Sequence, residues 1–292
     1  MDVLGTGIDL HTHSTASDGT VAPQDLVRQA REQGLTALAL TDHDTTAGWA
    51  AAQEALPGGL RLVRGVELSC VAGGISLHVL GYLFDPAEPA FAATRAELRD
   101  SRVHRAQRMA ERLEQAGTGV TWQRVRELAG GTVGRPHLAQ ALIEQGLIGS
   151  VSEAFSPQWI GAGGRFWVPK TEVDVLEGIR LITAAGGVAV FAHPAAASRG
   201  RTVGDDVIAA MAAAGLAGLE VDHVDHDEPA RAHLSALARE LGLLSTGSSD
   251  FHGTAKTVRL GAHTTSPEVL AALVARASGV PVLVGSGDGA PG

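Results

Sequence analysis

The chain has 292 residues, of which 45% are hydrophobic and 19% charged, so it is long enough for one large globular domain or a domain with an insertion. Its formal net charge of -9 argues against nucleic-acid binding through a broad basic face, while a local pocket for a small anion stays compatible with it. The single cysteine, Cys70, excludes an internal disulfide framework and a cysteine-rich zinc module, and we expect it to fill space in the core.

The predicted elements begin with a short apolar strand that leads into Asp9-Leu10-His11-Thr12-His13. Two histidines spaced two residues apart on a strand project from the same side. Asp18 follows at the end of the next loop. Neutral imidazoles and a carboxylate are common ligands of a divalent transition metal, so this segment predicts part of a metal site.

Strands and helices then alternate as far as residue 83. Pro23 suits the first turn of a helix, and Gly34 suits the end of that helix. Polar residues stand at or just beyond the predicted strand ends, at His43, Glu67 and His78. This pattern is typical of a βα barrel whose chemistry lies on one face. We predict helices over residues 23–33 and 46–55, and strands over 35–40, 61–68 and 75–83.

The alternation stops at Asp85-Pro86, and residues 87–170 lack buried-strand runs. We predict that they form a helical insertion that caps the barrel. Near its end, Trp159, Phe166 and Trp167 are expected to form a small core that seats the cap, with stacking on a base as the alternative. The predicted helices cover residues 90–116, 122–128, 137–145 and 152–156.

The long helix of this insertion carries six arginines, whose spacing divides them between two faces. Such a helix forms either an electrostatic funnel for nucleotides or RNA, or a solvated surface helix paired with neighbouring carboxylates. We favour the solvated helix because no aromatic residues are interleaved for stacking. The six are Arg95, Arg99, Arg102, Arg105, Arg108 and Arg112.

After the insertion the alternation resumes, with helices over residues 173–185, 205–214, 228–241 and 267–277 and strands over 188–192, 216–221 and 243–246. His193, His223 and the pair Asp250 and His252 follow these three strands in turn. We therefore assign residues 1–86 and 171–278 to a discontinuous metal-binding barrel, and residues 279–292 to a flexible, glycine-rich tail.

Nine candidate ligands thus fall at strand ends that would meet at one barrel mouth. One ion needs four to six ligands, so nine indicate two or three ions that share bridging groups. Glu67 is the best bridging candidate, because a carboxylate can bind one ion through each oxygen. Asp42 and Asp44 flank His43 and are expected to orient it or to cap the next helix. The nine ligands are His11, His13, Asp18, His43, Glu67, His78, His193, Asp250 and His252.

These motifs resemble those of the polymerase and histidinol phosphatase (PHP) family over about residues 7–85 and 171–265. The resemblance implies a distorted, TIM-like (β/α)7 barrel of the α/β class with three metal positions. Manganese, iron and zinc are typical of the family, and nitrogen and oxygen ligands suit each of them. By analogy, the first ion would be held by His11, His13, Glu67 and Asp250, the second by Glu67, His78 and His193, and the third by Asp18, His43 and His252.

Two further segments, residues 134–139 (Gly-Arg-Pro-His-Leu-Ala) and 220–223 (Glu-Val-Asp-His), resemble a branch of stand-alone phosphatases similar to 3',5'-nucleoside bisphosphate phosphatase, some of which act on RNA 5' ends. Residues 222–227 are more acidic than is usual in that branch. Arg135 is expected to bind a substrate phosphate with its planar guanidinium. His137 would bind phosphate or protonate the leaving group, His223 would face the mouth, and His226 is a further substrate-binding candidate.

The predicted activity is metal-dependent hydrolysis of phosphate monoesters of small nucleotides, such as 3',5'-bisphosphates or AMP-like substrates, with short RNA 5' ends as further substrates. A hydroxide held between two ions would attack phosphorus, so no serine or cysteine nucleophile is required. Catalytic roles are expected for Glu67, Asp250, His193, His137 and His223.

Three alternatives fit parts of the same pattern: a histidinol-phosphate phosphatase, another amidohydrolase-like hydrolase and a non-catalytic metal-binding module. The motif around Arg135 speaks against the first. His252 adds a ligand beyond the lone aspartate usual in amidohydrolases, and the complete ligand set speaks against the third. The chain has no signal-peptide pattern and no apolar run of 18 residues, which predicts a cytoplasmic protein without membrane association.

Overall fold

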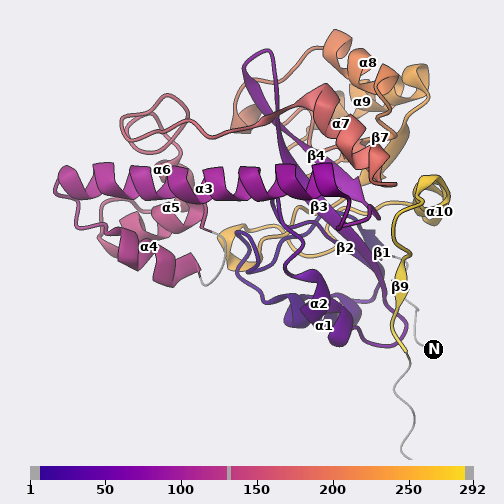
Figure 1. Ribbon diagram of the computed structural model, residues 1–292, viewed down its shortest axis with the longest axis horizontal. Coiled ribbons are helices and arrows are strands. Elements are labelled where there is room, and N and C mark those ends of the chain that lie inside the picture. The colour runs from indigo at the N-terminus through magenta and orange to yellow at the C-terminus, as the bar shows by residue number, and fades with distance from the viewer. Residues whose placement is uncertain (1–6, 130–132, 287–292) are drawn as a thin grey trace, which may run out of the picture.

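The structure, a computed structural model, describes residues 7–129 and 133–286 and is built around one mixed sheet (Figure 1). Along the sheet the strand order is β1-β2-β3-β4-β6-β7-β8, and β5 and β9 pair with β3 beside this path. The strands are β1 (Gly7–Asp9), β2 (Leu35–Leu40), β3 (Arg61–Ala72), β4 (Ile75–Tyr82), β5 (Val173–Asp174), β6 (Val188–Phe191), β7 (Gly218–Asp222), β8 (Leu244–Gly247) and β9 (Leu283–Val284). The α-helices are α1 (Pro23–Glu32), α2 (Trp49–Glu54), α3 (Pro89–Gln115), α4 (Trp122–Ala129), α5 (Arg135–Glu144), α6 (Val151–Ala154), α7 (Val175–Ala184), α8 (Asp205–Ala213), α9 (Glu228–Leu241) and α10 (Pro267–Arg276).

Strands β3 and β4 form an antiparallel hairpin, and β4 is also antiparallel to β6. Gly73 and Gly74 make the turn with φ angles of 54° and 74°, a conformation that favours glycine. The predicted alternation of parallel strands and helices is therefore wrong here, because two turn residues leave no room for a crossover helix. As a result, Glu67 and His78 lie within strands rather than at the strand ends where we predicted them.

The two faces of the sheet carry different hydrophobic clusters, because successive side chains of a strand point to opposite faces. On β2, Leu38 and Leu40 join the cluster that packs under the helices, whereas Ala37 and Ala39 join an inner cluster. That inner cluster collects side chains from β1, β2, β3, β4 and β6 and from Ala217 just before β7, so the sheet is strongly curved. Across the inner face, the hydroxyl of a β4 residue, Tyr82, donates to the carbonyl of Leu10 at 2.8 Å.

The continuous ladder ends at β1 on one side and β8 on the other. Just beyond these two strands, Thr12 and Phe251 form an isolated parallel bridge, and the His13 amide donates to the Phe251 carbonyl at 2.9 Å. A mixed α/β fold with a central sheet is thus confirmed, and closure of that sheet into a (β/α)7 barrel stays a prediction.

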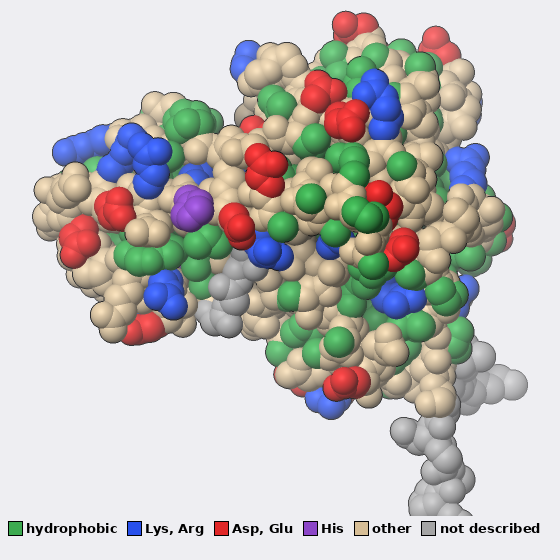
Figure 2. Space-filling view, viewed as in Figure 1, with side chains coloured by type: hydrophobic (Ala, Val, Ile, Leu, Met, Phe, Trp, Pro, Cys, Tyr) green, Lys and Arg blue, Asp and Glu red, His purple; other side chains and the backbone are tan. Residues whose placement is uncertain are grey.

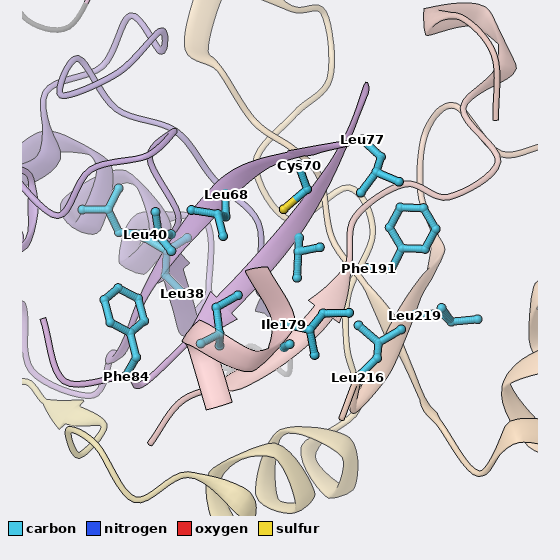
Figure 3. Packing of buried hydrophobic residues seen from close by; sticks show 14 of the residues in the cluster. Leu38, Leu40, Leu68, Cys70, Leu77, Phe84, Ile179, Phe191, Leu216 and Leu219 are labelled. Carbon is cyan, nitrogen blue, oxygen red and sulfur yellow. The ribbon is translucent and has the colours of Figure 1, made fainter. Parts of the chain in front are cut away.

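Helix α7 packs against the outer face of β3 and β4, where Cys70 lies fully buried among leucine, isoleucine and phenylalanine side chains (Figure 3). A β-carbon at Gly178 of α7 would lie 2.9 Å from the Cys70 sulfur. The glycine therefore allows the helix to approach the strand closely, and the predicted packing role of Cys70 is confirmed.

Between β4 and β5 the described residues form helices α3 to α6, as predicted, and these project to one side of the sheet (Figure 1). They have a hydrophobic cluster of their own, separate from the clusters of the sheet. Trp159 and Phe166 stack in it with ring centroids 6.0 Å apart, and Trp167 packs at its margin, so the three aromatic residues belong to this core. The division of the chain into barrel and cap stays a prediction.

Three of the six arginines of α3 are covered, contrary to the solvated helix that we predicted, whereas Arg108 and Arg112 are exposed. Arg102 pairs with Asp44 at 3.0 Å, and Arg105 donates from Nε to the Val168 carbonyl at 2.7 Å. Arg95 is buried as well. The sheet and the segment after α6 cover this helix face, which a charge pattern alone cannot reveal. Acidic and basic side chains are mixed over the surface shown in Figure 2, in keeping with the absence of a broad basic face there.

The segment after Ser278 is not simply a loose tail. Its strand β9 pairs antiparallel with β3, with Val284 opposite Arg61, and Val280 and Val282 pack against the inner cluster. The prediction of a flexible tail is therefore wrong for residues 279–286, and residues 287–292 lie outside the described part of the chain. Within the described ranges, no helix has the length and apolarity needed to cross a bilayer.

Candidate metal centre

Glu67, near the middle of β3, lies at the centre of a cluster of imidazoles. Its Oε1 is 2.7 Å from His78 Nδ1 and 3.0 Å from His193 Nε2. The other oxygen, Oε2, lies 3.0 Å from His13 Nε2, 3.1 Å from His43 Nδ1 and 3.3 Å from His11 Nε2. One buried carboxylate thus faces five imidazole rings, two of them through Oε1 and the other three through Oε2.

The structure brings all nine predicted ligands to this one place. Among the described residues, three overlapping groups each have candidate ligand atoms within 4.8 Å of one another. His193 joins them through its contact with Glu67. The groups are His13, Asp18, His43 and His252; His11, His13, Glu67 and Asp250; and His43, Glu67 and His78.

The arrangement of these atoms fits divalent cations. Two buried nitrogens, His43 Nδ1 and His78 Nδ1, lie close to Glu67 oxygens and yet have no hydrogen-bond partner among the residues that the structure describes. His11 Nε2 and His13 Nε2 lie 3.1 Å apart. Ligand atoms that each lie about 2.0–2.2 Å from one ion are separated by about 3–3.5 Å. Both the donor types and their spacing therefore suit transition metals.

Hydrogen bonds at the ring nitrogens that face away from the cluster fix the tautomer and the ring orientation of two of these histidines. His11 Nδ1 lies 3.1 Å from Glu220 Oε1, and His252 Nδ1 lies 2.8 Å from the Asp250 carbonyl. These acceptors require a proton on Nδ1, which leaves the Nε2 lone pair directed into the cluster.

Burial and pairing set the protonation of the cluster. Burial would raise the pKa of Glu67, but the facing imidazoles hold it well below its usual range. Burial would lower the pKa of His13, but Asp250 and Glu67 raise it to about 9. For His252, burial and the ammonium of Lys256 lower the pKa to about 4. The buried Glu67 carboxylate thus stays ionised and attracts positive charge, supplied either by protons or by metal ions.

Glu220 is a site residue that sequence reasoning missed. It is fully buried, its Oε1 faces His11 Nδ1 at 3.1 Å, and its Oε2 accepts a hydrogen bond from the His193 amide at 2.7 Å. Burial would raise its pKa, but His11 and the neighbouring histidines lower it to about 2. An acidic residue within an apolar strand was the available signal, since such a residue is costly to bury unpaired.

Lys256 was also missed. Its ammonium lies 2.5 Å from Asp250 Oδ2, on the loop that follows β8. Asp250 therefore meets a cation on one oxygen, while its other oxygen faces His11 and His13 at 3.4 and 3.3 Å. Lys256 lies in a loop without periodicity, so the sequence around it did not predict its contact with Asp250.

Three buried aspartates hold the segments around the cluster together. Each accepts one hydrogen bond from a serine amide and one from the hydroxyl of the same serine, at distances of 2.6 to 3.1 Å. We call each pair an Asp–Ser clasp. The positioning role expected of Asp42 and Asp44 fits this geometry, because a clasp ties two neighbouring strand ends together. The three clasps are Asp9–Ser249, Asp42–Ser14 and Asp44–Ser69.

Backbone strain is concentrated around the candidate metal ligands. Asp44, His193 and Asp250 have φ angles of 56°, 32° and 54°, in the left-handed region that non-glycine residues rarely adopt. Each lies just beyond a strand, at β2, β6 and β8. Strain of this kind persists only where surrounding contacts enforce it, and it clusters at functional sites.

Two further histidines each direct one ring nitrogen away from the backbone. The Asp225 amide donates to His223 Nδ1 at 3.0 Å, and the Gly134 amide donates to His137 Nδ1 at 3.0 Å. With Nδ1 accepting, the proton of a neutral ring is on Nε2. His223 Nε2 lies 3.6 Å from Asp250 Oδ2 and has no hydrogen-bond partner within the described part of the chain, so it presents a donor at the cluster.

Two of the predicted substrate-binding residues, His226 and Arg135, make different kinds of contact. Both nitrogens of His226 contact the backbone, at the Ala195 amide and the Val221 carbonyl, so this ring positions loops and the prediction that it binds substrate does not fit. Arg135, at the start of α5, packs over the Phe155 ring at 4.7 Å. The adjacent Gly134 lies beside Asp18, which brings this end of α5 to the cluster.

Comparison with known proteins decides the family, because the model of the PHP domain matches residues 9–189. The chain belongs to the PHP family. It is 34% identical over 264 residues to a 3',5'-nucleoside bisphosphate phosphatase of Chromobacterium violaceum, covering 88% of this chain and 91% of the relative. It is 35% identical over 254 residues to a 5'-3' exoribonuclease of Haemophilus influenzae, covering 87% and 92%.

Two solved structures are similar to this chain over nearly its whole length. A structure from Bifidobacterium adolescentis assigned as a metal-dependent phosphoesterase matches with a TM-score of 0.87 and 36% identity, over 94% of this chain and 97% of that one. A Chromobacterium violaceum protein described as an amidohydrolase with bound sulfate and no metal matches with a TM-score of 0.82 and 30% identity, over 95% and 98%. The predicted PHP family and the predicted class of metal-dependent phosphoesterase are confirmed.

Proposed function

We propose that this PHP protein hydrolyses phosphate monoesters of small nucleotides, such as 3',5'-bisphosphates or AMP-like substrates, and acts on the 5' ends of short RNA. The observation that carries the proposal is Glu67, whose two oxygens divide five buried imidazoles between them. Such a carboxylate is suited to joining two cation positions, and phosphoester hydrolysis is the reaction that clustered divalent ions serve best.

Two to three divalent ions of manganese, iron or zinc would be held by the predicted ligand sets. Bound there, they would lower the pKa of water, neutralise phosphate oxygens and stabilise the leaving alkoxide. Their ligands come from six separate segments, and the clasps and Glu220 hold those segments in place. These nine residues are His11, His13, Asp18, His43, Glu67, His78, His193, Asp250 and His252.

The chain's own residues donate hydrogen bonds and orient the substrate. His223 presents its Nε2–H beside Asp250, where it would donate a hydrogen bond to a phosphate oxygen or to the leaving oxygen. His137 offers a second Nε2 donor from the insertion. Arg135 presents a planar guanidinium fixed by its contact with Phe155, which suits binding of a phosphate group.

The names of the relatives support nucleotide phosphoesters as the substrate class. One is a nucleoside bisphosphate phosphatase, others are 5'-3' exoribonucleases, and a fifth is a phosphoribosyl 1,2-cyclic phosphate 1,2-diphosphodiesterase. The sulfate in the Chromobacterium violaceum structure is an anion of phosphate shape. No observation of the site favours histidinol phosphate over a nucleotide.

The proposal is tested with a panel of AMP, adenosine 3',5'-bisphosphate, short 5'-phosphorylated RNA and histidinol phosphate, assayed for phosphate and nucleotide release. Protein treated with chelator and protein reconstituted with manganese are compared on each substrate. Nucleotide turnover that needs metal is expected. Exclusive turnover of histidinol phosphate, or equal turnover with and without metal, would contradict the proposal.

A variant at Arg135 refines the assignment. Arg135→Ala should keep its metal content and lose about 2–4 kcal/mol of transition-state stabilisation on nucleotides, because truncating a buried charged hydrogen bond costs about that much. A larger loss on nucleotides than on p-nitrophenyl phosphate places Arg135 on a phosphate that does not react, and an equal loss places it on the reacting one. Unchanged kinetics on both substrates would remove Arg135 from substrate binding.

A further inference from the structure

The ammonium of Lys256 lies at the rim of the metal centre. Its Nζ is 2.5 Å from Asp250 Oδ2, and its side chain is 32% exposed, whereas that of Asp250 is 1% exposed. Within the described part of the chain, Asp250 supplies the one hydrogen bond of this ammonium. An ammonium has three N–H donors, so two of them remain available to a molecule that enters from solvent.

The loop that carries Lys256 is fixed by contacts with the loop between β1 and α1. The Thr254 amide donates to Thr20 Oγ1 at 2.8 Å, and the Thr20 amide donates to the His252 carbonyl at 3.1 Å. Gly253 has a φ angle of 67° and permits this close approach, because a β-carbon there would lie 2.1 Å from Thr20 Oγ1. Lys256 is therefore attached to a loop that also carries a candidate metal ligand.

Asp250 connects the ammonium to the metal centre, because its two oxygens face different groups. Its Oδ1 lies 3.4 Å from His11 Nε2 and 3.3 Å from His13 Nε2. Its Oδ2 accepts from Lys256 and lies 3.6 Å from His223 Nε2. One oxygen thus faces a candidate cation position, and the other faces two donors that lie next to that position.

A role as the counter-ion of Asp250 does not account for Lys256 in metal-loaded protein. A divalent ion held with His11 and His13 would neutralise the Asp250 carboxylate, and the ammonium would then lie close to a charge of its own sign. Like charges at such short range repel each other. An anion in contact with both the ion and the ammonium would offset this repulsion, and the phosphoryl group of a substrate is such an anion.

We propose that Lys256 is a further catalytic residue, whose ammonium donates a hydrogen bond to an oxygen of the phosphoryl group that is hydrolysed. This inference rests on the proposed phosphoesterase function. Lysine suits the role because its compact charge carries several donors, so that one can stay on Asp250 while another contacts the substrate. A donor that is held in place before the reaction stabilises negative charge as it develops in the transition state.

The test uses Lys256→Met, with Lys256→Arg as the variant that keeps the charge. Arg259→Gln is a matched control, since Arg259 is an exposed cation of the same loop. The first readout is the number and affinity of bound manganese ions, from elemental analysis and calorimetric titration. The second is the binding of inorganic phosphate to manganese-loaded protein, and the third is kcat/KM for adenosine 3',5'-bisphosphate and for p-nitrophenyl phosphate.

We expect Lys256→Met to lower kcat/KM about 100-fold on both substrates, the loss typical of one missing oxyanion donor. Phosphate binding should weaken about tenfold, because a hydrogen bond between charged groups is lost. Manganese content should be unchanged, and manganese affinity should be unchanged or higher, because a neighbouring positive charge has been removed. Lys256→Arg should recover part of the loss, and Arg259→Gln should resemble the wild type in every readout.

Two results would overturn the proposal. An unchanged kcat/KM in Lys256→Met would exclude contact with the reacting group. A fall in manganese affinity that accounts for the lost activity would show that Lys256 only positions Asp250. If Lys256→Met does not fold, Lys256→Gln is judged by the same criteria. If the wild-type protein hydrolyses no phosphoester, the proposed function itself is wrong, whereas a loss confined to the Lys256 variants concerns this residue alone.

Discussion

At the scale of single residues, the site contains several buried carboxylates, and each contacts a different kind of group. Glu67 faces imidazoles on both oxygens, whereas each aspartate of the Asp–Ser clasps faces a serine. Glu220 faces an imidazole with one oxygen and a backbone amide with the other. The same chemical group therefore serves as a metal-ligand candidate, a positioning residue or a structural anchor according to its partners.

Glu67→Gln should lose more than one metal ion per chain and should lose activity. The amide cannot donate electron pairs through both atoms, and it would place N–H groups against ring nitrogens that lie 2.7 to 3.3 Å away. Elemental analysis of the reconstituted variant measures this loss, with the exposed Glu177→Gln as control. Turnover close to wild type would rule out the bridging role.

Lys170→Met should increase the stability of the metal-free protein by about 1–3 kcal/mol at pH 7. Burial is the first cause that lowers the pKa of Lys170 from 10.5 to about 8, so its charged form is disfavoured in the folded state. Between pH 8 and 10.5 the unfolded chain binds more protons than the folded chain. The free-energy cost of burying the charged Lys170 is therefore complete below pH 8 and disappears as the pH rises to 10.5. Urea unfolding at pH 7 and pH 10 measures both effects, and a destabilised variant at pH 7 would contradict the account.

At the scale of elements, β3 organises the sheet. It pairs with β2, β4, β5 and β9, carries Glu67 at its centre and holds Cys70 against α7. Its length of 12 residues lets one end join the sheet beside β2 while the other extends into the hairpin. The site therefore depends on how closely α7 packs on this strand.

Gly178→Ala tests that packing. The new methyl group would lie 2.9 Å from the Cys70 sulfur, so we expect a loss of about 1–2 kcal/mol despite the higher helix propensity of alanine. In a Cys70→Ala background the sulfur is absent, so the same change should cost less, although the methyl group would still lie 3.2 Å from Leu68 and 3.3 Å from Val173. Thermal unfolding of the four proteins gives the coupling, and additive effects would show that the contact does not limit α7.

The sequence predicted the helices and indicated which polar residues would lie together, because periodicity and strand-end polar residues are local signals. It did not predict that β4 runs antiparallel, although Gly73 and Gly74 marked a tight turn. The burial of Arg102 and the contact of Lys256 with Asp250 depend on segments far away in the chain. Such partners are set by tertiary packing, and no charge pattern on one helix or loop identifies them.

At the scale of the whole molecule, the metal centre connects segments from residue 11 to residue 252. A cation bound there interacts with several strands and loops at once. Because the unfolded chain cannot assemble these ligands, binding energy adds directly to the stability of the fold.

Manganese should therefore raise the free energy of unfolding of the metal-free protein. At a free concentration 100 times the dissociation constant, the gain for one site is about 2.7 kcal/mol. Calorimetric melting with increasing manganese measures it, and the gain should be much smaller in Glu67→Gln. A melting temperature that does not respond to manganese, zinc or iron would contradict a metal centre at this cluster.

The pairing of β9 with β3 also bears on how the chain folds. Arg61 and Leu62 are synthesised well before their partners Val284 and Leu283. Until β9 is made, this part of β3 has no β9 partner on the side away from β2, and open strand edges are the part of a sheet that pairs with other chains. A truncated chain that ends before β9 would leave this part of β3 without that partner, so β9 protects it against pairing with other chains.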